Sequence, residues 1–166
     1  MASSKSDNKK IGCIIIGVIL GFVVLGVVGI LMALAVPAFI QFTRKSQAIE
    51  GQLNVTAIAS AVQIKYAESC ELPPNGSPSM ATLPTYGSEQ ATDYSGEGWK
   101  TINYNGAPTE FFQYRFDRVD PTKIVVKGEH DFSGSGGVNH TASITLTTTG
   151  KCDIEMGELV VENELE

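Results

Sequence analysis

The sequence predicts an α+β fold in which a long N-terminal helix, transmembrane in its first half, packs on a four-stranded antiparallel sheet. Three observations predict it. Residues 11–36 are all apolar or glycine, residues 37–68 continue with helical periodicity, and several runs between residues 112 and 161 alternate apolar and polar residues. These patterns are typical of a membrane helix, an amphipathic helix and half-buried strands, in that order.

The first ten residues are polar and basic, and we expect them to form a cytoplasmic leader without periodic structure. The 26 uncharged residues from Ile11 to Val36 would reach ~39 Å as a helix, more than the ~30 Å hydrocarbon core of a bilayer. Lys9 and Lys10 precede this run directly. The positive-inside rule therefore predicts a single-pass membrane protein with a cytoplasmic N-terminus. Arg44 and Lys45 follow the run and weaken this prediction, which then depends on the cysteines as well.

The apolar run has two further features. Its length exceeds the ~7–15 apolar residues of a secretory signal peptide, which favours a retained anchor over cleavage near Ala35. Gly17 and Gly21 have the GxxxG spacing that lets a second membrane helix approach closely. The alternative is that these glycines are incidental, since glycine is common in membrane helices.

The helix predicted over 37–68 carries two apolar stripes on nearly opposite faces. The first contains Ala48, Val55, Ile58, Ala59, Val62 and Tyr66, and the second contains Ile49, Leu53, Ala57 and Ile64. A helix that only covers its own sheet needs one stripe. We expect the first stripe to pack on the sheet. The second would contact neighbouring helices or, alternatively, lie under the loop that follows Cys70.

A turn-rich loop is predicted over 71–98, with Tyr86, Tyr94 and Trp99 anchoring it to the core. The sheet is predicted within residues 99–162. Its strands lie around 112–117, 124–127 and 142–147, with a short last strand at 159–161. Together, the apolar anchor (11–36) and these elements divide the chain into a leader (1–10), a membrane segment and an extracytoplasmic domain (37–166).

The cysteines bear on the compartment. Cys13 lies in the apolar run, whereas Cys70 and Cys152 flank most of the soluble part. A disulfide between Cys70 and Cys152 is the expectation if the domain faces an oxidising compartment, such as the periplasm or the cell exterior. Two free thiols in a cytosolic domain are the alternative.

Charge and motifs limit the function classes. Residues 46–166 contain seven basic and 17 acidic residues, which argues against a nucleic-acid partner. We find no catalytic constellation, and we expect no enzyme activity, cofactor, metal or small-molecule substrate. His130 and His140 are interpreted as surface residues around a flexible turn, and 131–136 as a poor match to a calcium loop. The acidic C-terminal residues, from Asp153 onward, are interpreted as a solvated tail.

The eleven residues from Gly29 to Phe39 combine a glycine, apolar residues with interspersed alanines, and the sequence Pro37-Ala38-Phe39. This segment and the helix that continues it resemble the N-terminal helix of type IV pilins and of type II secretion pseudopilins. The resemblance implies a pilin-like fold, in which Gly29 and Pro37 kink or soften the helix.

Two positions depart from the family pattern. Leu20 stands where the family has a glutamate, 17 residues before the proline. Ile15 stands where the family has the glycine that precedes cleavage by prepilin peptidase. Gly12, which ends the basic leader, is the nearest glycine and the possible cleavage position.

The resemblance implies a structural subunit, pilin-like or pseudopilin-like, held in the inner membrane. Its partners would be the membrane, other pilin-like subunits and the assembly platform of a pilus or secretion system. The alternative is a membrane-tethered binding module with the same fold that does not polymerise. The absent glutamate favours this alternative, and the second apolar stripe favours the subunit.

Overall fold

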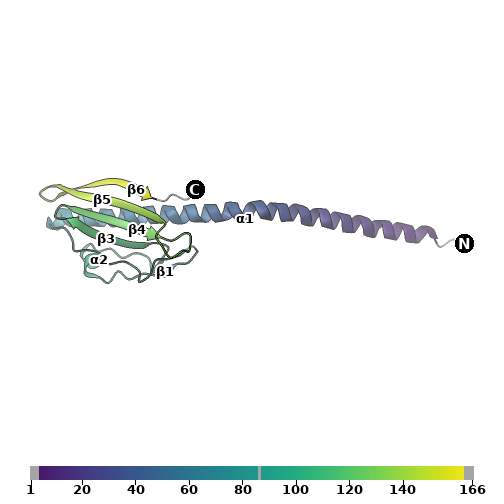
Figure 1. Ribbon diagram of the computed structural model, residues 1–166, viewed down its shortest axis with the longest axis horizontal. Helices are drawn as coiled ribbons and strands as arrows, with labels where there is room; N and C mark the ends of the chain where they lie inside the picture. The colour runs from purple at the N-terminus through teal and green to yellow at the C-terminus, as the bar shows by residue number, and fades with distance from the viewer. Residues whose placement is uncertain (1–3, 86, 163–166) are drawn as a thin grey trace. The chain divides into compact units, whose positions relative to one another are not determined.

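The computed structural model describes residues 4–85 and 87–162, with side chains from residue 17 onward. The chain forms two compact units, Met1–Thr43 and Arg44–Glu166. Helix α1, Ser4–Ser69, contributes residues to both units (Figure 1).

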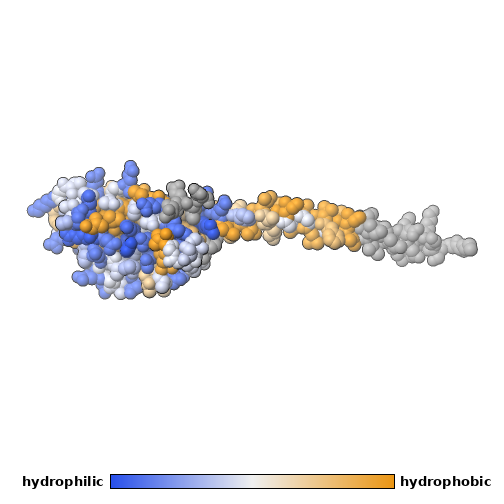
Figure 2. Space-filling model, in the orientation of Figure 1, coloured by the Kyte–Doolittle hydropathy of each residue, from blue (hydrophilic) through white to orange (hydrophobic). Residues whose placement is uncertain are grey.

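The N-terminal unit is helical from Ser4. The expectation that the leader lacks periodic structure is therefore wrong for residues 4–10. Lysine is a good helix former, and extending an existing helix costs less than starting one. From Gly17 onward α1 is long and apolar enough to be a candidate membrane span, and its most apolar window contains no buried residue. Figure 2 shows the described surface of this unit to be largely hydrophobic.

The C-terminal unit contains a four-stranded antiparallel sheet in the order β3-β4-β5-β6, a meander as predicted. A two-stranded sheet, β1-β2, and a short helix, α2, lie in the connection between α1 and β3. The bounds are β1 Gln90–Ala91, α2 Glu97–Thr101, β2 Thr109–Glu110, β3 Gln113–Asp120, β4 Lys123–His130, β5 His140–Gly150 and β6 Asp153–Glu162.

The core lies between α1 and one face of this sheet. Alternate residues of the strands point into it, which confirms the period-two pattern, and the first stripe of α1 is buried against them. The strand residues are Tyr114, Phe116, Ile124, Val126, Ala142, Ile144 and Leu146, and the helix residues are Ala48, Val55, Ile58, Ala59, Val62 and Tyr66.

Three elements differ from the sequence prediction. The region assigned to the sheet from residue 99 begins with α2, and the predicted loop contains β1. The last strand spans ten residues rather than three, so residues 153–162 are not a solvated tail. Its pairing shifts between Ile144 and Leu146, where a bulge turns Leu159 toward the face that Met156 occupies. The bulge breaks the simple alternation that would have revealed the strand.

A glycine allows close packing between α1 and the ring of Phe112. A Cβ on Gly51 would lie 2.7 Å from atoms of this buried ring. Gly51→Ala should therefore destabilise the domain by about 1–3 kcal/mol through overpacking, although alanine is the better helix former by ~1 kcal/mol. Denaturant unfolding of the full chain in detergent tests this, and an increase in stability would contradict it. Gly26→Ala, at a position with open space, is the control.

The predicted disulfide between Cys70 and Cys152 is present, with a Cα–Cα distance of 4.2 Å. Cys70 also ends α1, since it adopts φ 57° and its N–H donates to the Tyr66 carbonyl at 2.7 Å. A left-handed residue is a common helix terminator, but it is usually glycine. Cys152 has φ 63° in the turn before β6. The bridge thus joins two strained backbone positions at the end of the helix and the start of the last strand.

Candidate functional site

The second apolar stripe of α1 is exposed in the C-terminal unit. Ile49, Leu53 and Ile64 keep 55%, 65% and 61% of their surface accessible, and Ala57 between them is exposed as well. Singly exposed apolar residues are common, but a row of them along one helix face indicates an interaction surface. We call these four residues the exposed stripe.

The loop after Cys70 does not cover the exposed stripe, so that alternative is wrong. Residues 75–80 instead follow the outer edge of β3, where the N–H groups of Gly76 and Ser79 donate to the carbonyls of Phe116 and Tyr114. The unpaired backbone groups of an edge strand attract such a segment. The loop covers the β3 edge of the sheet and leaves the exposed stripe of α1 accessible.

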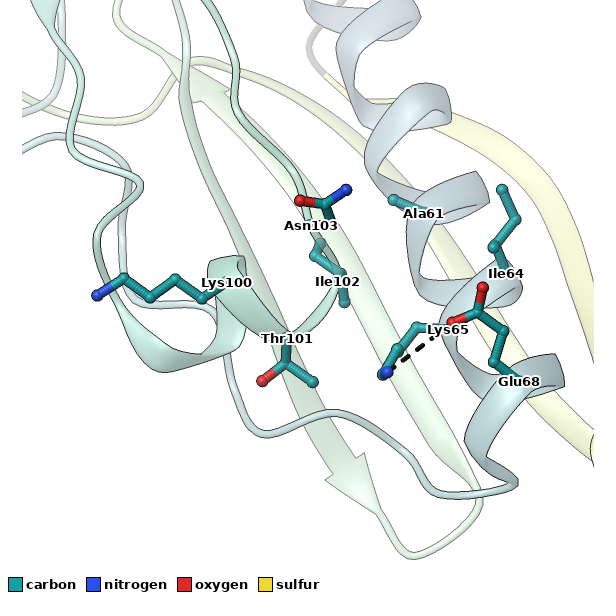
Figure 3. Close-up of a pocket in the computed structure, with 8 residues that line it drawn as sticks. All are labelled: Ala61, Ile64, Lys65, Glu68, Lys100, Thr101, Ile102 and Asn103. Carbon is teal, nitrogen blue, oxygen red and sulfur yellow. Dashed lines mark ion pairs between the residues drawn. The ribbon is translucent and has the colours of Figure 1, made fainter.

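A groove of about 560 Å³ adjoins the stripe at Ile64 (Figure 3). One wall is α1, with Ala61, Lys65 and Glu68, and the other is formed by residues 100–103 at the end of α2. Lys65 and Glu68 form a partly exposed ion pair at 3.8 Å, and such pairs contribute little to stability. The groove therefore combines this ion pair with the exposed apolar side chain of Ile64, and Lys100 is the other charged residue that lines it.

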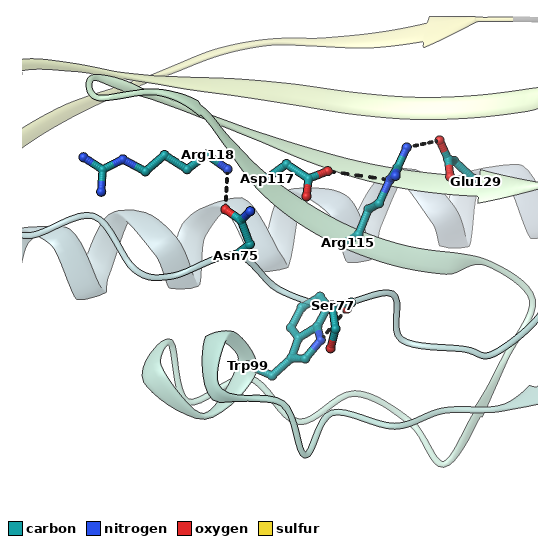
Figure 4. A network of polar contacts seen from close by, with 7 residues as sticks. All are labelled: Asn75, Ser77, Trp99, Arg115, Asp117, Arg118 and Glu129. Atoms are coloured by element: carbon teal, nitrogen blue, oxygen red, sulfur yellow. Dashed lines mark hydrogen bonds and ion pairs between the residues drawn. The ribbon is translucent and has the colours of Figure 1, made fainter.

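Trp99 fixes the α2 wall of this groove. Its indole is buried and packs edge-on against Phe116, with ring centroids 5.0 Å apart. The indole N–H donates to the Ser77 carbonyl at 2.8 Å (Figure 4). The neighbouring loop is attached through Asn75, whose side-chain oxygen accepts the backbone N–H of Arg118 at 2.8 Å. These contacts attach the outer wall of the groove to the core and to β3, although α2 has only five residues.

The outer face of the sheet carries its own ion pairs. Arg115 on β3 donates to Glu129 on β4 at 3.0 Å and lies 3.7 Å from Asp117 (Figure 4). All three side chains are partly exposed, so the group is a solvated network on the face away from α1.

The two histidines are buried, which corrects their interpretation as surface residues. His130 and His140 are opposite each other on β4 and β5, and both pack against Phe112 and Phe132. Sequence reasoning missed them because the glycine-rich turn between them suggested exposure. Burial, and then the neighbouring His140, lower the pKa of His130 to about 4.

This pKa makes stability depend on pH. His130 is held neutral in the folded state, whereas in the unfolded chain it takes up a proton below its ordinary pKa of ~6.5. The domain should lose about 3 kcal/mol as the pH falls from ~6.5 to ~4. In His130→Leu this loss should be largely absent, as measured by urea unfolding of the full chain at pH 7 and 4.5. An equal loss in both proteins would contradict the assignment.

The turn between β4 and β5 is organised by Asp131. Its carboxylate accepts the backbone N–H groups of Ser133, Gly134 and Gly136 at 2.6–2.9 Å. The hydrogen bond from the Ser133 hydroxyl, at 2.7 Å, and then these backbone hydrogen bonds lower the pKa of Asp131. The carboxylate that a calcium loop would use for its ion thus serves the turn itself.

Glu110 is a buried carboxyl group that sequence reasoning missed. Burial raises its pKa, even though the Tyr94 hydroxyl and the Ala107 N–H donate to it. Glu50 on α1 is half-buried, and its pKa is raised by burial and by Glu89. Only the position of Glu110 in a polar segment was visible in the sequence, so nothing there marked it as buried.

Tyr86, predicted to anchor the loop, lies outside the described residues, and the other residues still to be placed lie in α1. Pro37 is inside the helix. A Cβ at Gly17, Gly21 or Gly29 would meet no atom within 4 Å beyond the backbone of α1, so these positions are open to another helix. Gly12 lies in the helical backbone, and the roles of these glycines stay predictions. The residues at the end of α2 that form the groove carry no motif, so only the structure reveals them.

The comparisons with protein-family models, curated proteins and solved structures found no match to this chain.

Proposed function

We propose that the protein is a membrane-anchored structural subunit of the pilin or pseudopilin type. In this proposal, the exposed stripe of α1 packs against helices of neighbouring subunits. The observation that carries it is the difference in burial between the two apolar stripes of α1. The first stripe is buried in the domain core, and the exposed stripe is not covered by any part of the domain that the structure describes.

The composition of the N-terminal unit supports the same proposal. Its apolar side chains are exposed from Val18 to Val36, and they need either lipid or other helices around them. The architecture, a long N-terminal helix with an antiparallel sheet, is compatible with a pilin-like fold.

The disulfide supports an outward-facing domain in this proposal. Disulfides persist outside the cytoplasm and are rare within it. The N-terminus would then be cytoplasmic, in agreement with Lys9 and Lys10 next to the apolar run.

The second candidate is a membrane-tethered binding module that does not polymerise. Leu20, in the position where the resembling family has a glutamate, is the observation that favours it. If that charge is needed for assembly, the protein would cap, initiate or stay out of filaments rather than build them.

Sedimentation of membranes solubilised in mild detergent from producing cells tests the proposal. The wild-type chain should migrate in large assemblies. In Leu53→Asp the ratio of assembled to monomeric protein should fall at least tenfold, since a carboxylate would be buried in the helix contact. Val138→Asp, at an exposed apolar position in the β4–β5 turn, is the matched control. A monomeric wild-type chain would support the tethered module and overturn the proposal.

A further inference from the structure

We infer that neighbouring copies of this chain join through opposite charges, with the groove beside α2 on one copy receiving the acidic last strand of the next. This inference rests on the proposed function and names the surfaces by which the domains would meet.

The two surfaces lie on opposite flanks of α1. On one flank, Gln63 donates from α1 to the Ile154 carbonyl of β6 at 3.1 Å. On the other flank, Ile64 and Lys65 face the residues at the end of α2 across the groove. Figure 3 shows the helix between the groove and β6, the yellow strand behind it. The exposed stripe lies between these flanks.

The charges of the two surfaces are complementary. Within β6, Asp153, Glu155, Glu158 and Glu162 are acidic and exposed, and that strand carries no basic residue. The groove is lined by two lysines, Lys65 and Lys100, and by one acid, Glu68, which pairs with Lys65, so its net positive charge comes from Lys100. In the described part of the chain, Lys100 and the β6 carboxylates form no ion pair. An overall acidic domain would repel its copies unless contacts of this kind are present.

A second copy is the occupant that fits these observations. A contact between two different surfaces of the same chain is heterologous, and it repeats from copy to copy instead of closing a two-fold dimer. Two copies meeting through β6 alone would place carboxylates against carboxylates. Lys100 supplies the positive charge that such an edge requires, and the exposed side chain of Ile64 adds apolar area at the same groove.

Charge reversal in the full chain tests the inference. Lys100→Glu and Glu158→Lys should each reduce the assembled fraction about tenfold at low salt in the sedimentation experiment. The double variant Lys100→Glu/Glu158→Lys, in which both surfaces are reversed in every copy, should recover wild-type assembly. Lys123→Glu, an exposed residue of β4, changes the net charge equally and should have no such effect.

The outcomes separate this inference from the function on which it rests. Assembly of both single variants at the wild-type level, together with loss of assembly in Leu53→Asp, would overturn the inference and leave the proposed function in place. Loss in both single variants without recovery in the double variant would also overturn it. If Leu53→Asp assembles like the wild type, both the function and the inference are overturned.

Discussion

Replacing Ile58 with aspartate is expected to unfold the C-terminal unit, whereas the same replacement at Leu53 is expected to leave it folded. Ile58 is wholly buried against the sheet, and Leu53 lies on the exposed stripe of the same helix. An unpaired carboxylate in the core costs several kcal/mol, and the lost packing of isoleucine adds to it. The total, at least about 4 kcal/mol, approaches the ~5–15 kcal/mol stability of a small domain. At Leu53 the cost should stay below about 1 kcal/mol, mainly from helix propensity.

The fluorescence of Trp99 can measure both changes in the full chain in detergent, because this tryptophan is the single one in the sequence and is buried. The expected result is a strongly lowered or absent unfolding transition for Ile58→Asp and a nearly unchanged midpoint for Leu53→Asp. Similar destabilisation by the two variants would show that the stripes do not differ in burial.

Removing the disulfide is the second change with a large expected effect. In the double variant Cys70→Ser/Cys152→Ser, the unfolded chain regains the freedom that a bridge across 82 positions removes. Chain-entropy reasoning gives a loss of about 4 kcal/mol, a model-dependent figure. The variant should also release two left-handed backbone positions that the bridge helps to hold.

Urea unfolding followed by Trp99 fluorescence, with and without a reductant, measures this loss. The wild-type chain under reduction should match the double variant, and Cys13→Ser should match the oxidised wild type. A double variant as stable as the wild type would remove the structural role of the bridge. Alkylation of both cysteines in protein taken directly from cells, with free thiols blocked, would contradict an outward-facing domain.

Much of the fold could be predicted from the sequence because its patterns are strongly periodic. The uncharged run from Ile11, the alternation around Tyr114 and Ile144, and the first stripe of α1 each match one period of secondary structure. The exposed stripe could be predicted from the sequence for the same reason, since placing residues at 100° per position shows which of them share one face of a helix. The disulfide followed from having two cysteines in the soluble part.

The rest depends on tertiary contacts that have no period. His130 and His140 are buried because β4 and β5 bring them together against Phe132 and against Phe112, which is distant in the sequence. The bulge in β6 breaks the alternation that strand prediction uses. The groove needs the end of α2, a helix too short to show periodicity, and Trp99 holds it in place.

Site-directed cross-linking at Leu53 is the most direct test of the claim that the exposed stripe contacts other copies. A full chain with the photo-reactive residue p-benzoylphenylalanine in place of Leu53 would be irradiated in the native membranes and run on a denaturing gel. The same replacement at Thr145, exposed on the outer face of β5, is the control. The account predicts covalent dimers at Leu53 and few at Thr145. Absence of dimers at Leu53, or equal amounts at both positions, would contradict it.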